Sequence, residues 1–205
     1  MLLQDKVCVV TGAASPRSIG HATAELFSEH GAKVVVVDLV MDERPHGLKC
    51  DISSVTDCER VTREVVARYG TIDCLVNSAA IVKSQPLLAI SEADFSKMLD
   101  VNLKGTFNIC KSVLTVFAER KRGAIVNLAS VAAQRGGGLV GGAHYAASKG
   151  GVISLTKAIA REFGPLGIRA NVVCPSMTET GMLDGNVTPD QFQDIVAGIP
   201  LRRAG

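Results

Sequence analysis

The sequence predicts an α/β fold, a three-layer domain in which a doubly wound parallel sheet is covered by helices on both faces. Two observations carry this prediction. Short runs of β-branched residues alternate with amphipathic stretches along the chain, and a glycine-containing turn directly follows the first run. Repetition of strand, helix and strand implies a parallel sheet buried on both faces. No linker or internal repeat divides the 205 residues, so we predict one domain spanning residues 1–205.

The strands are predicted from five apolar, β-branched runs and from a weaker sixth between the second and the third. The five clear runs are residues 7–10, 34–37, 72–76, 124–128 and 170–173, and the weak one is residues 48–50. Only twelve residues separate Asp38 from Asp51, which is too few for a helix as well as a strand. We therefore expect an abbreviated crossover there.

Amphipathic helices are predicted between the strands from apolar residues spaced three and four apart. The first begins near Ile19, the second ends at Gly70, and a long third one carries an apolar stripe as far as Phe117. Two pairs have the spacing of capping boxes, with Asp in place of Glu, and would begin the second and third helices: Ser54 with Asp57, and Ser91 with Asp94.

Composition and charge exclude several kinds of partner. Hydrophobic residues make up 47% and charged residues 20%, with no apolar stretch long enough to span a bilayer and no signal peptide at the start. This predicts a soluble, cytoplasmic protein. A net charge of +2 without a Lys/Arg cluster gives no reason to expect nucleic acid or a membrane as partner. Six single cysteines and four histidines lack metal-ligand spacing, so we expect reduced cysteines and no metal.

Polar residues gather where the predicted strands end. In an open parallel sheet, ligands bind in the crevice outside the carboxyl ends of the strands. The residues found at these ends, in chain order, are Gly12, Asp38, Asp51, Asn77, Ser130 and Pro175. This edge of the sheet is therefore the predicted ligand site.

The turn after the first strand is a candidate pyrophosphate site. Its glycines would let backbone N–H groups approach a phosphate, which the start of the next helix also attracts. Asp38 follows Gly20 by eighteen residues, where an acidic side chain accepts hydrogen bonds from adenosine ribose hydroxyls. Asp38 would repel a 2′-phosphate, which favours NAD over NADP. Arg17 could still bind that phosphate, so NADP remains possible.

Two further features suggest catalysis. Asn102 lies on the apolar stripe of the third helix, so its amide must sit in a polar network or hold water, and structural and catalytic roles are equally open. Tyr145 and Lys149 lie one turn apart on a helix, and a cation there favours the phenolate of a tyrosine whose ordinary pKa is about 10. Taken alone, such a pair is more often accidental. Together with the strand-end residues, it favours Tyr145 as a catalytic acid/base.

These residues together resemble the short-chain dehydrogenase/reductase family, whose members have a Rossmann fold, and the resemblance covers the chain from Lys6 onward. It implies that Tyr145 exchanges a proton, Lys149 lowers its pKa and holds the nicotinamide ribose, Ser130 binds the substrate oxygen, and Asn102 anchors a proton-relaying water. The catalytic set is thus Asn102, Ser130, Tyr145 and Lys149. The expected cofactor contacts are Gly12, Arg17, Ser18, Ile19, Asp38, Asp51, Ile52, Asn77, Ala79, Tyr145, Lys149, Pro175, Thr178 and Thr180.

The chain also departs from the family pattern. The first turn is two residues longer than the common one, and Ser18 replaces its second glycine, so the phosphate loop should follow a different path. The extra residues between Ser130 and Tyr145 fall in a glycine-rich run, residues 136–142, which we expect to be a mobile loop and harmless to catalysis. After Gly205 the family continues with a helix and a seventh strand, both absent here. A chain that truly ends at Gly205 would be expected to be less stable or incompletely assembled, and a fragment or an unseen tail is an equal alternative.

The resemblance implies an oxidoreductase that transfers hydride between NAD(H) and a secondary alcohol or ketone. An alternative is an NADPH-dependent 3-oxoacyl thioester reductase, which Asp38 disfavours. A non-catalytic nucleotide-binding regulatory protein on the same fold is a further alternative, which the complete catalytic set disfavours. The helices predicted over residues 91–119 and 144–163 resemble the family's dimer-forming pair, so we expect a homodimer or homotetramer. An apolar lid, or simple packing onto the core, is expected for Met182, Leu183, Phe192 and Ile195.

Overall fold

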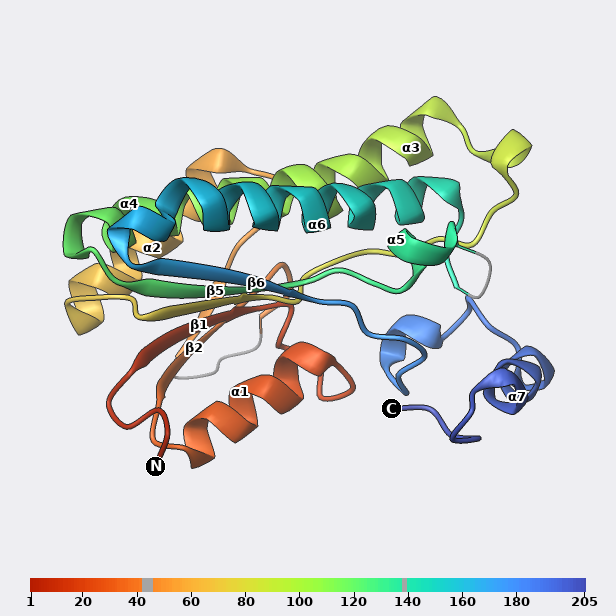
Figure 1. Ribbon diagram of the computed structural model, residues 1–205, viewed down its shortest axis with the longest axis horizontal. Helices are drawn as coiled ribbons and strands as arrows, with labels where there is room; N and C mark the ends of the chain where they lie inside the picture. Colours follow the sequence, from red (N-terminus) through yellow and green to blue (C-terminus); the bar gives the residue numbers. More distant parts are fainter. Residues whose placement is uncertain (42–45, 138–139) are drawn as a thin grey trace.

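The computed structural model describes residues 1–41, 46–137 and 140–205, and it confirms the predicted three-layer α/β fold. Six parallel strands form one sheet in the order β3-β2-β1-β4-β5-β6 (Figure 1). The strands are β1 Val7–Thr11, β2 Lys33–Asp38, β3 Gly47–Lys49, β4 Cys74–Asn77, β5 Gly123–Leu128 and β6 Ile168–Val173. The weakest predicted strand is therefore real, and it pairs with β2 at the edge of the sheet.

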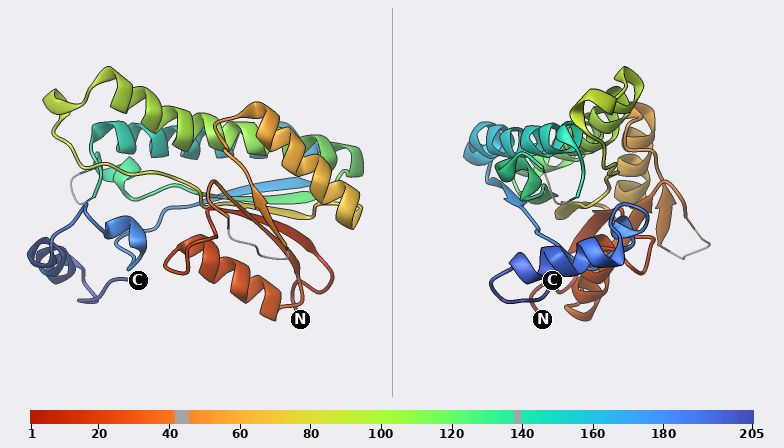
Figure 2. Two further views of the ribbon diagram at one scale, coloured as in Figure 1. Left: turned by 180° about the vertical axis from the view of Figure 1, so that it is seen from behind. Right: turned by 90° about the vertical axis from the view of Figure 1, so that its right-hand side faces the viewer.

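The helices lie on both faces of the sheet, as expected of a doubly wound fold. Figures 1 and 2 show α2, α4 and α6 on one face and α1 on the other, with α7 beyond the carboxyl ends of the strands. The α-helices are α1 Ile19–Glu29, α2 Val55–Tyr69, α3 Glu92–Leu99, α4 Gly105–Arg120, α5 Ala132–Arg135, α6 Ala143–Phe163 and α7 Pro189–Gly198. Short 3-10 turns occupy Leu87–Ala89, Gly164–Leu166 and Gly181–Leu183.

The predicted starts of α2 and α3 are confirmed at the level of the N-cap. The Ser54 and Ser91 hydroxyl oxygens accept hydrogen bonds from the backbone N–H groups of Asp57 and Asp94 at 3.2 and 3.1 Å. The reciprocal half of the capping box is replaced at α2, because the Asp57 carboxylate accepts from the backbone of Asp51 instead. This hydrogen bond connects the start of α2 to the turn after β3.

The long helix expected after Ser91 is divided in three. Helices α3 and α4 are joined by a π-turn at Asp100–Lys104, which contains the buried Asn102. A π-turn inserts one extra residue per turn and shifts the phase of the apolar stripe. This explains why Phe95 and Phe107, which straight helical spacing would place on that stripe, are half-exposed in the structure.

The sheet centre is the core of the protein. All five residues of β1 are buried: Val7 and Val9 pack with apolar side chains from α2 and α4, and Val10 packs on the side of α1. Gly123 begins β5 against the fully buried Phe117 ring, where an added Cβ would lie 2.2 Å from ring carbon Cδ2. Side chains packed at this density hold the strands, and hence the strand ends, in fixed relative positions.

The connection from β2 to β3 is abbreviated as predicted, because the described residues between the two strands form no helix, while residues 42–45 lie outside the described part of the chain. Residues 138–139 of the glycine-rich run also lie outside it. None of the helices in the described ranges has the length and apolar character to cross a bilayer. All six cysteines are free, and four of them are buried.

Candidate active site

A cavity of about 1260 Å³ lies at the carboxyl ends of the strands, next to β1, which has β2 on one side and β4 on the other. This is the point of strand-order reversal at which open α/β sheets bind ligands. One end of the cavity carries Asp38 and Asp51, and the other carries Ser130, Tyr145 and Lys149. Two groups of predicted residues, far apart in sequence, thus share one cavity.

The loop after β1 follows a compact path into α1. Gly12 adopts a φ of +67°, and an added Cβ would lie 2.5 Å from the backbone of Ala79, so only glycine fits there. Ser18 caps α1 by accepting from the N–H of His21 at 3.0 Å, while its hydroxyl also lies within hydrogen-bonding distance of the carbonyl oxygens of Gly12 and Ser15. Ser18 therefore replaces the family's second glycine with a side chain that organises the loop. The N-terminus of α1, with its partial positive charge, borders the cavity.

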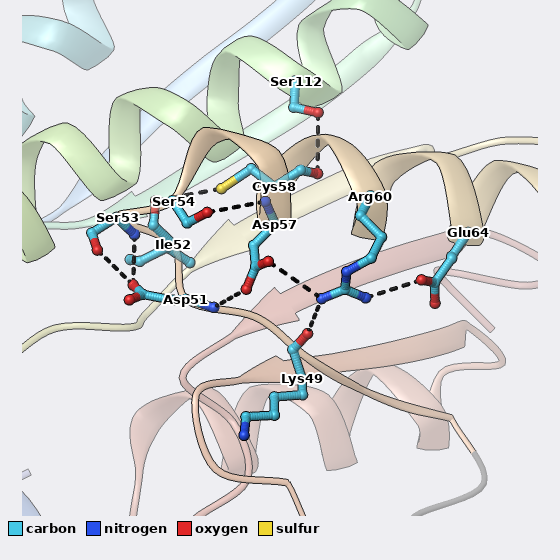
Figure 3. Close-up of polar contacts among 10 residues, drawn as sticks. All are labelled: Lys49, Asp51, Ile52, Ser53, Ser54, Asp57, Cys58, Arg60, Glu64 and Ser112. Carbon is cyan, nitrogen blue, oxygen red and sulfur yellow. Dashed lines mark hydrogen bonds and ion pairs between the residues drawn. The ribbon is translucent and has the colours of Figure 1, made fainter.

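The end of the cavity that carries Asp38 is framed by the turn after β3. The Asp51 carboxylate accepts hydrogen bonds from the backbone and hydroxyl of Ser53 at 2.9 and 2.7 Å (Figure 3). The amide of Asn108 on α4 donates to the carbonyl oxygens of Ile52 and Ser53, each at 3.1 Å. Asp51 and Ile52 both line the cavity. The turn is thus held rigidly by a residue that the sequence analysis missed.

A second network, centred on α2, also holds the turn after β3. Arg60 on α2 donates to the carbonyl oxygen of Lys49 at 2.6 Å and to the carboxylate of Glu64 at 2.9 Å (Figure 3). Its guanidinium also lies 3.9 Å from the Asp57 carboxylate, which in turn accepts from the N–H of Asp51. These contacts connect α2 to both sides of the strand end and fix the position of Asp51.

The opposite end of the cavity, called the catalytic end below for the predicted roles of its residues, brings together three of the four residues predicted to be catalytic. Ser130 follows β5 and Tyr145 and Lys149 lie on α6, and all three line the cavity. The Lys149 ammonium donates to the carbonyl oxygen of Leu128 at 2.8 Å and lies 5.9 Å from the centre of the Tyr145 ring. Lys149 is 3% exposed and Tyr145 is 7% exposed, so both reactive groups are nearly shielded from water.

Burial controls the acidity of these groups. It lowers the pKa of Lys149 to about 8, because the charged ammonium loses its hydration. It also raises the pKa of the Tyr145 phenol, and a hydrogen bond with Ser130 offsets only part of that rise. Desolvation thus sets the net upward direction of the Tyr145 pKa, and a lowering of that pKa by Lys149 stays a prediction.

Asn102 lies behind the catalytic end and is fully buried. Its amide oxygen accepts from the N–H of Ile81 at 2.9 Å, and its amide nitrogen donates to the Ile81 carbonyl oxygen and to the Ser148 hydroxyl at 2.9 and 3.1 Å. The side chain therefore joins the loop after β4 to the helix that carries Tyr145. Asn102 is not among the described residues that line the cavity.

Asn77 likewise lies inside a polar network. It accepts from the Thr11 hydroxyl at 3.4 Å and donates to Asn127 at 2.7 Å, and Asn127 donates to Thr156 at 2.9 Å. This chain of contacts connects β1, β4, β5 and α6. Among the described residues, the cavity wall includes neighbouring Ala79 but not Asn77, so Asn77 shapes the site from behind.

The segment after β6 forms the remaining wall. Pro175, Thr178 and Thr180 line the cavity, and the Pro175 carbonyl oxygen accepts from the N–H of Val131 at 3.1 Å. Arg17 reaches across to this segment and forms an ion pair with Asp184 at 3.0 Å, a partner that the sequence analysis did not identify. Of the residues considered for an apolar lid, Met182 and Leu183 line the cavity, whereas Phe192 and Ile195 lie half-buried on α7.

Comparisons with known proteins agree with this geometry. A family model described as enoyl-(acyl carrier protein) reductase matches residues 12–205. An uncharacterized short-chain type dehydrogenase/reductase of Sinorhizobium fredii, y4mP, is 40% identical over the whole chain and 87% of its own length. A 3-oxoacyl-[acyl-carrier-protein] reductase, FabG, of Thermotoga maritima is 38% identical with the same coverage. The crystal structure of gox2181 has a TM-score of 0.92 at 30% identity, covering 99% of this chain and 84% of that protein.

The fold and the strand-end site define a nucleotide-binding class of α/β protein. Within it, the chain belongs to the short-chain dehydrogenase/reductase family and is an oxidoreductase. The functional residues that sequence reasoning missed are Asn108, Asn127 and Asp184. The first two carried a usable signal, because an amide inside an apolar stretch must find a buried partner. Asp184 carried none, since an exposed acid on a loop has no distinguishing pattern.

Proposed function

We propose that this protein is an NAD(H)-dependent dehydrogenase that interconverts a secondary alcohol and a ketone. One observation carries the proposal: Ser130, Tyr145 and Lys149 converge at one end of a cavity whose other end carries the Asp38 carboxylate. A dinucleotide is long enough to need both ends, and the cavity runs past the N-terminus of α1 between them.

The residues present fit such a cofactor. Gly12 and the start of α1 suit a pyrophosphate, because the N-terminus of α1 carries a partial positive charge and its first turn has no acidic side chain. Asp38 suits the ribose hydroxyls next to the adenine, and Asp51 with Ile52 suits the adenine itself. Pro175, Thr178 and Thr180 suit the nicotinamide amide. When bound, the nicotinamide supplies the two-electron acceptor for the alcohol's hydride, or the donor in the reverse direction.

Proton transfer is the task of the chain's own residues. In the oxidation, the Tyr145 phenolate takes the hydroxyl proton of the alcohol as its carbinol hydrogen leaves as hydride, and in the reduction the Tyr145 phenol returns that proton. Ser130 hydrogen-bonds the same substrate oxygen and orients it. The Lys149 ammonium, held by Leu128, stabilises the negative charge that Tyr145 carries and binds the nicotinamide ribose. Asn102 positions the helix that carries Tyr145.

A second candidate is an NADPH-dependent 3-oxoacyl thioester reductase. Similarity to the Thermotoga maritima protein of that name favours it. Asp38 disfavours it, because a carboxylate at the ribose repels the 2′-phosphate of NADPH. A non-catalytic nucleotide-binding role is disfavoured by the burial and mutual contact of Tyr145 and Lys149, which a passive binding protein would not need.

The test combines binding with turnover. On mixing with the protein, the fluorescence of NADH should be quenched and its emission should shift. NADPH should bind more weakly than NADH. The protein with bound NADH should then reduce members of a ketone panel. Tyr145→Phe should keep NADH binding and lower turnover by orders of magnitude, since only the transferable proton is removed. The matched control is Tyr69→Phe, because Tyr69 bonds His46 on the exposed surface. Unchanged turnover in Tyr145→Phe, or binding of neither cofactor, would contradict the proposal.

A further inference from the structure

An ion pair crosses the mouth of the cofactor cavity. Arg17, in the loop before α1, donates from Nη1 and Nη2 to the two carboxylate oxygens of Asp184 at 3.0 and 3.2 Å. The Arg17 carbonyl oxygen also accepts from the N–H of Gly181 at 2.8 Å. The phosphate loop and the segment after β6 are therefore joined through both backbone and side chains.

The loop that carries Arg17 also borders the expected ribose site. Ala14, three residues earlier, donates its N–H to the Asp38 carboxylate at 3.0 Å. Four cationic residues line the cavity within the described ranges: Arg17, Lys97, Arg135 and Lys149. Lys149 and Arg135 lie at the catalytic end and Lys97 lies on α3, so only Arg17 shares a loop with a group bonded to Asp38.

The two terminal nitrogens of the Arg17 guanidinium already donate to the Asp184 carboxylate. A guanidinium recognises phosphate and carboxylate with the same pair of donors, so the two ligands compete for it. A 2′-phosphate at the Asp38 end would have to draw Arg17 away from Asp184 and would also meet the Asp38 charge. NAD lacks that phosphate and leaves the pair intact.

We propose that Asp184 is a determinant of cofactor choice: by holding Arg17 across the cavity it withholds this cation from a 2′-phosphate and so reinforces the preference for NAD. The inference rests on the proposed function, because it assumes that the cavity binds a nicotinamide dinucleotide. Asp184 acts through Arg17 and is a positioning residue. Asp38 and Asp184, which lie on opposite sides of the cavity, then exclude NADP by two separate means.

The test measures dissociation constants for NADH and NADPH by cofactor fluorescence, at low ionic strength because exposed ion pairs are screened by salt. Arg17 and Asp184 are 64% and 63% exposed, and exposed pairs change equilibria by about 5-fold at most. In Asp184→Asn we expect the preference for NADH over NADPH to fall by about 2- to 5-fold. Asp184→Ser should give the same shift. Asp190→Asn, which removes an exposed acid from the same C-terminal region, should leave the ratio unchanged.

Two double variants separate the mechanism from a general change of charge. Asp184→Asn should have no effect on the ratio in an Arg17→Gln background, and its full effect in an Asp38→Asn background. An unchanged ratio in Asp184→Asn, or a shift that persists without Arg17, overturns this inference while the proposed function stands. If the wild-type protein binds neither cofactor, the proposed function fails and this inference fails with it.

Discussion

The ammonium group of Lys149 donates a hydrogen bond of 2.8 Å to the carbonyl oxygen of Leu128, the residue that ends β5 two positions before Ser130. This contact fixes a cation at the catalytic end through a backbone acceptor at the end of the strand. The cation is almost fully buried, and that burial lowers the pKa of Lys149 from an ordinary value of 10.5 to about 8. The lysine therefore destabilises the fold at neutral pH.

Replacement of Lys149 by methionine should stabilise the protein while abolishing turnover. A pKa lowered from 10.5 to about 8 corresponds to about 3 kcal/mol of unfavourable free energy at neutral pH. Loss of the hydrogen bond to Leu128 offsets about 1–2 kcal/mol of that gain. The free energy of unfolding at pH 7, measured with urea, should therefore rise by about 1–2 kcal/mol.

The sign of the pH dependence provides a control. Between pH 8 and 10.5 the unfolded lysine still holds its proton and the folded one has released it, so wild-type stability from this group rises across that range. The advantage of Lys149→Met should be complete below pH 8 and should shrink above it. Lys157→Met, at an exposed position of α6, should show neither effect. A destabilised Lys149→Met would contradict the burial argument.

Alcohol oxidation and ketone reduction should depend differently on pH. Because burial raises the pKa of Tyr145, its phenol stays protonated at neutral pH, which suits the reduction. Oxidation needs the phenolate, so its kcat/KM should increase with pH over about pH 6 to 10, while that of reduction stays level before it falls. Initial rates in both directions check this. An oxidation rate that is independent of pH would exclude Tyr145 as the base.

Removal of the Asp38 charge should narrow or reverse the preference for NADH. The carboxylate lines the adenine end of the cavity and accepts from the N–H of Ala14, and its charge opposes a 2′-phosphate. In Asp38→Ala we expect kcat/KM for NADPH to approach or exceed that for NADH. Asp38→Asn keeps the shape of the side chain and removes its charge, so it should change the preference for NADH over NADPH by a similar factor if charge is the cause. An unaltered ratio in both variants would remove Asp38 from the site.

Much of the fold could be predicted from local patterns. The β-branched runs gave all five clear strands, and even the weak run near Leu48 forms β3 because it pairs with the buried β2. Strand edges were less accurate: β4 begins at Cys74 rather than Ile72. The π-turn at Asn102 could not be predicted, since it results from packing between the β4 loop and α6, which are distant in sequence from one another.

The sequence could predict which residues belong to the candidate site better than it could predict the contacts of their side chains. Strand-end position and family resemblance identified Ser130, Tyr145 and Lys149, which share one cavity. They could not reveal which groups hold the amides of Asn77 and Asn102, because those partners, such as Asn127 and Ile81, are distant in sequence. The same holds for the effect of burial, since the raised pKa of Tyr145 depends on surrounding atoms that no short motif encodes.

Truncation of Asn102 should destabilise the protein as well as slow catalysis. In Asn102→Ala the N–H and carbonyl of Ile81 lose their partners, and each unpaired buried group costs about 1–3 kcal/mol. We expect a loss of about 2–4 kcal/mol in the free energy of unfolding by urea. Asn171→Ala, at an exposed position of β6, is the control. An equally small effect in both variants would show that the contacts of Asn102 are dispensable.

The outer surface of α4 and α6 should form an interface between copies of the chain. Phe107 is 46% exposed, and with Leu103 and Leu155 it borders an apolar hollow of about 390 Å³ between these helices. We expect light scattering to report a dimer or tetramer, because exposed apolar clusters mark association surfaces. Phe107→Glu should shift the protein towards the monomer by placing a charge in that interface, whereas Leu88→Glu, on the 3-10 turn at Leu87–Ala89, should not. A wild-type monomer, or an assembly that Phe107→Glu leaves intact, would show that this face serves another purpose.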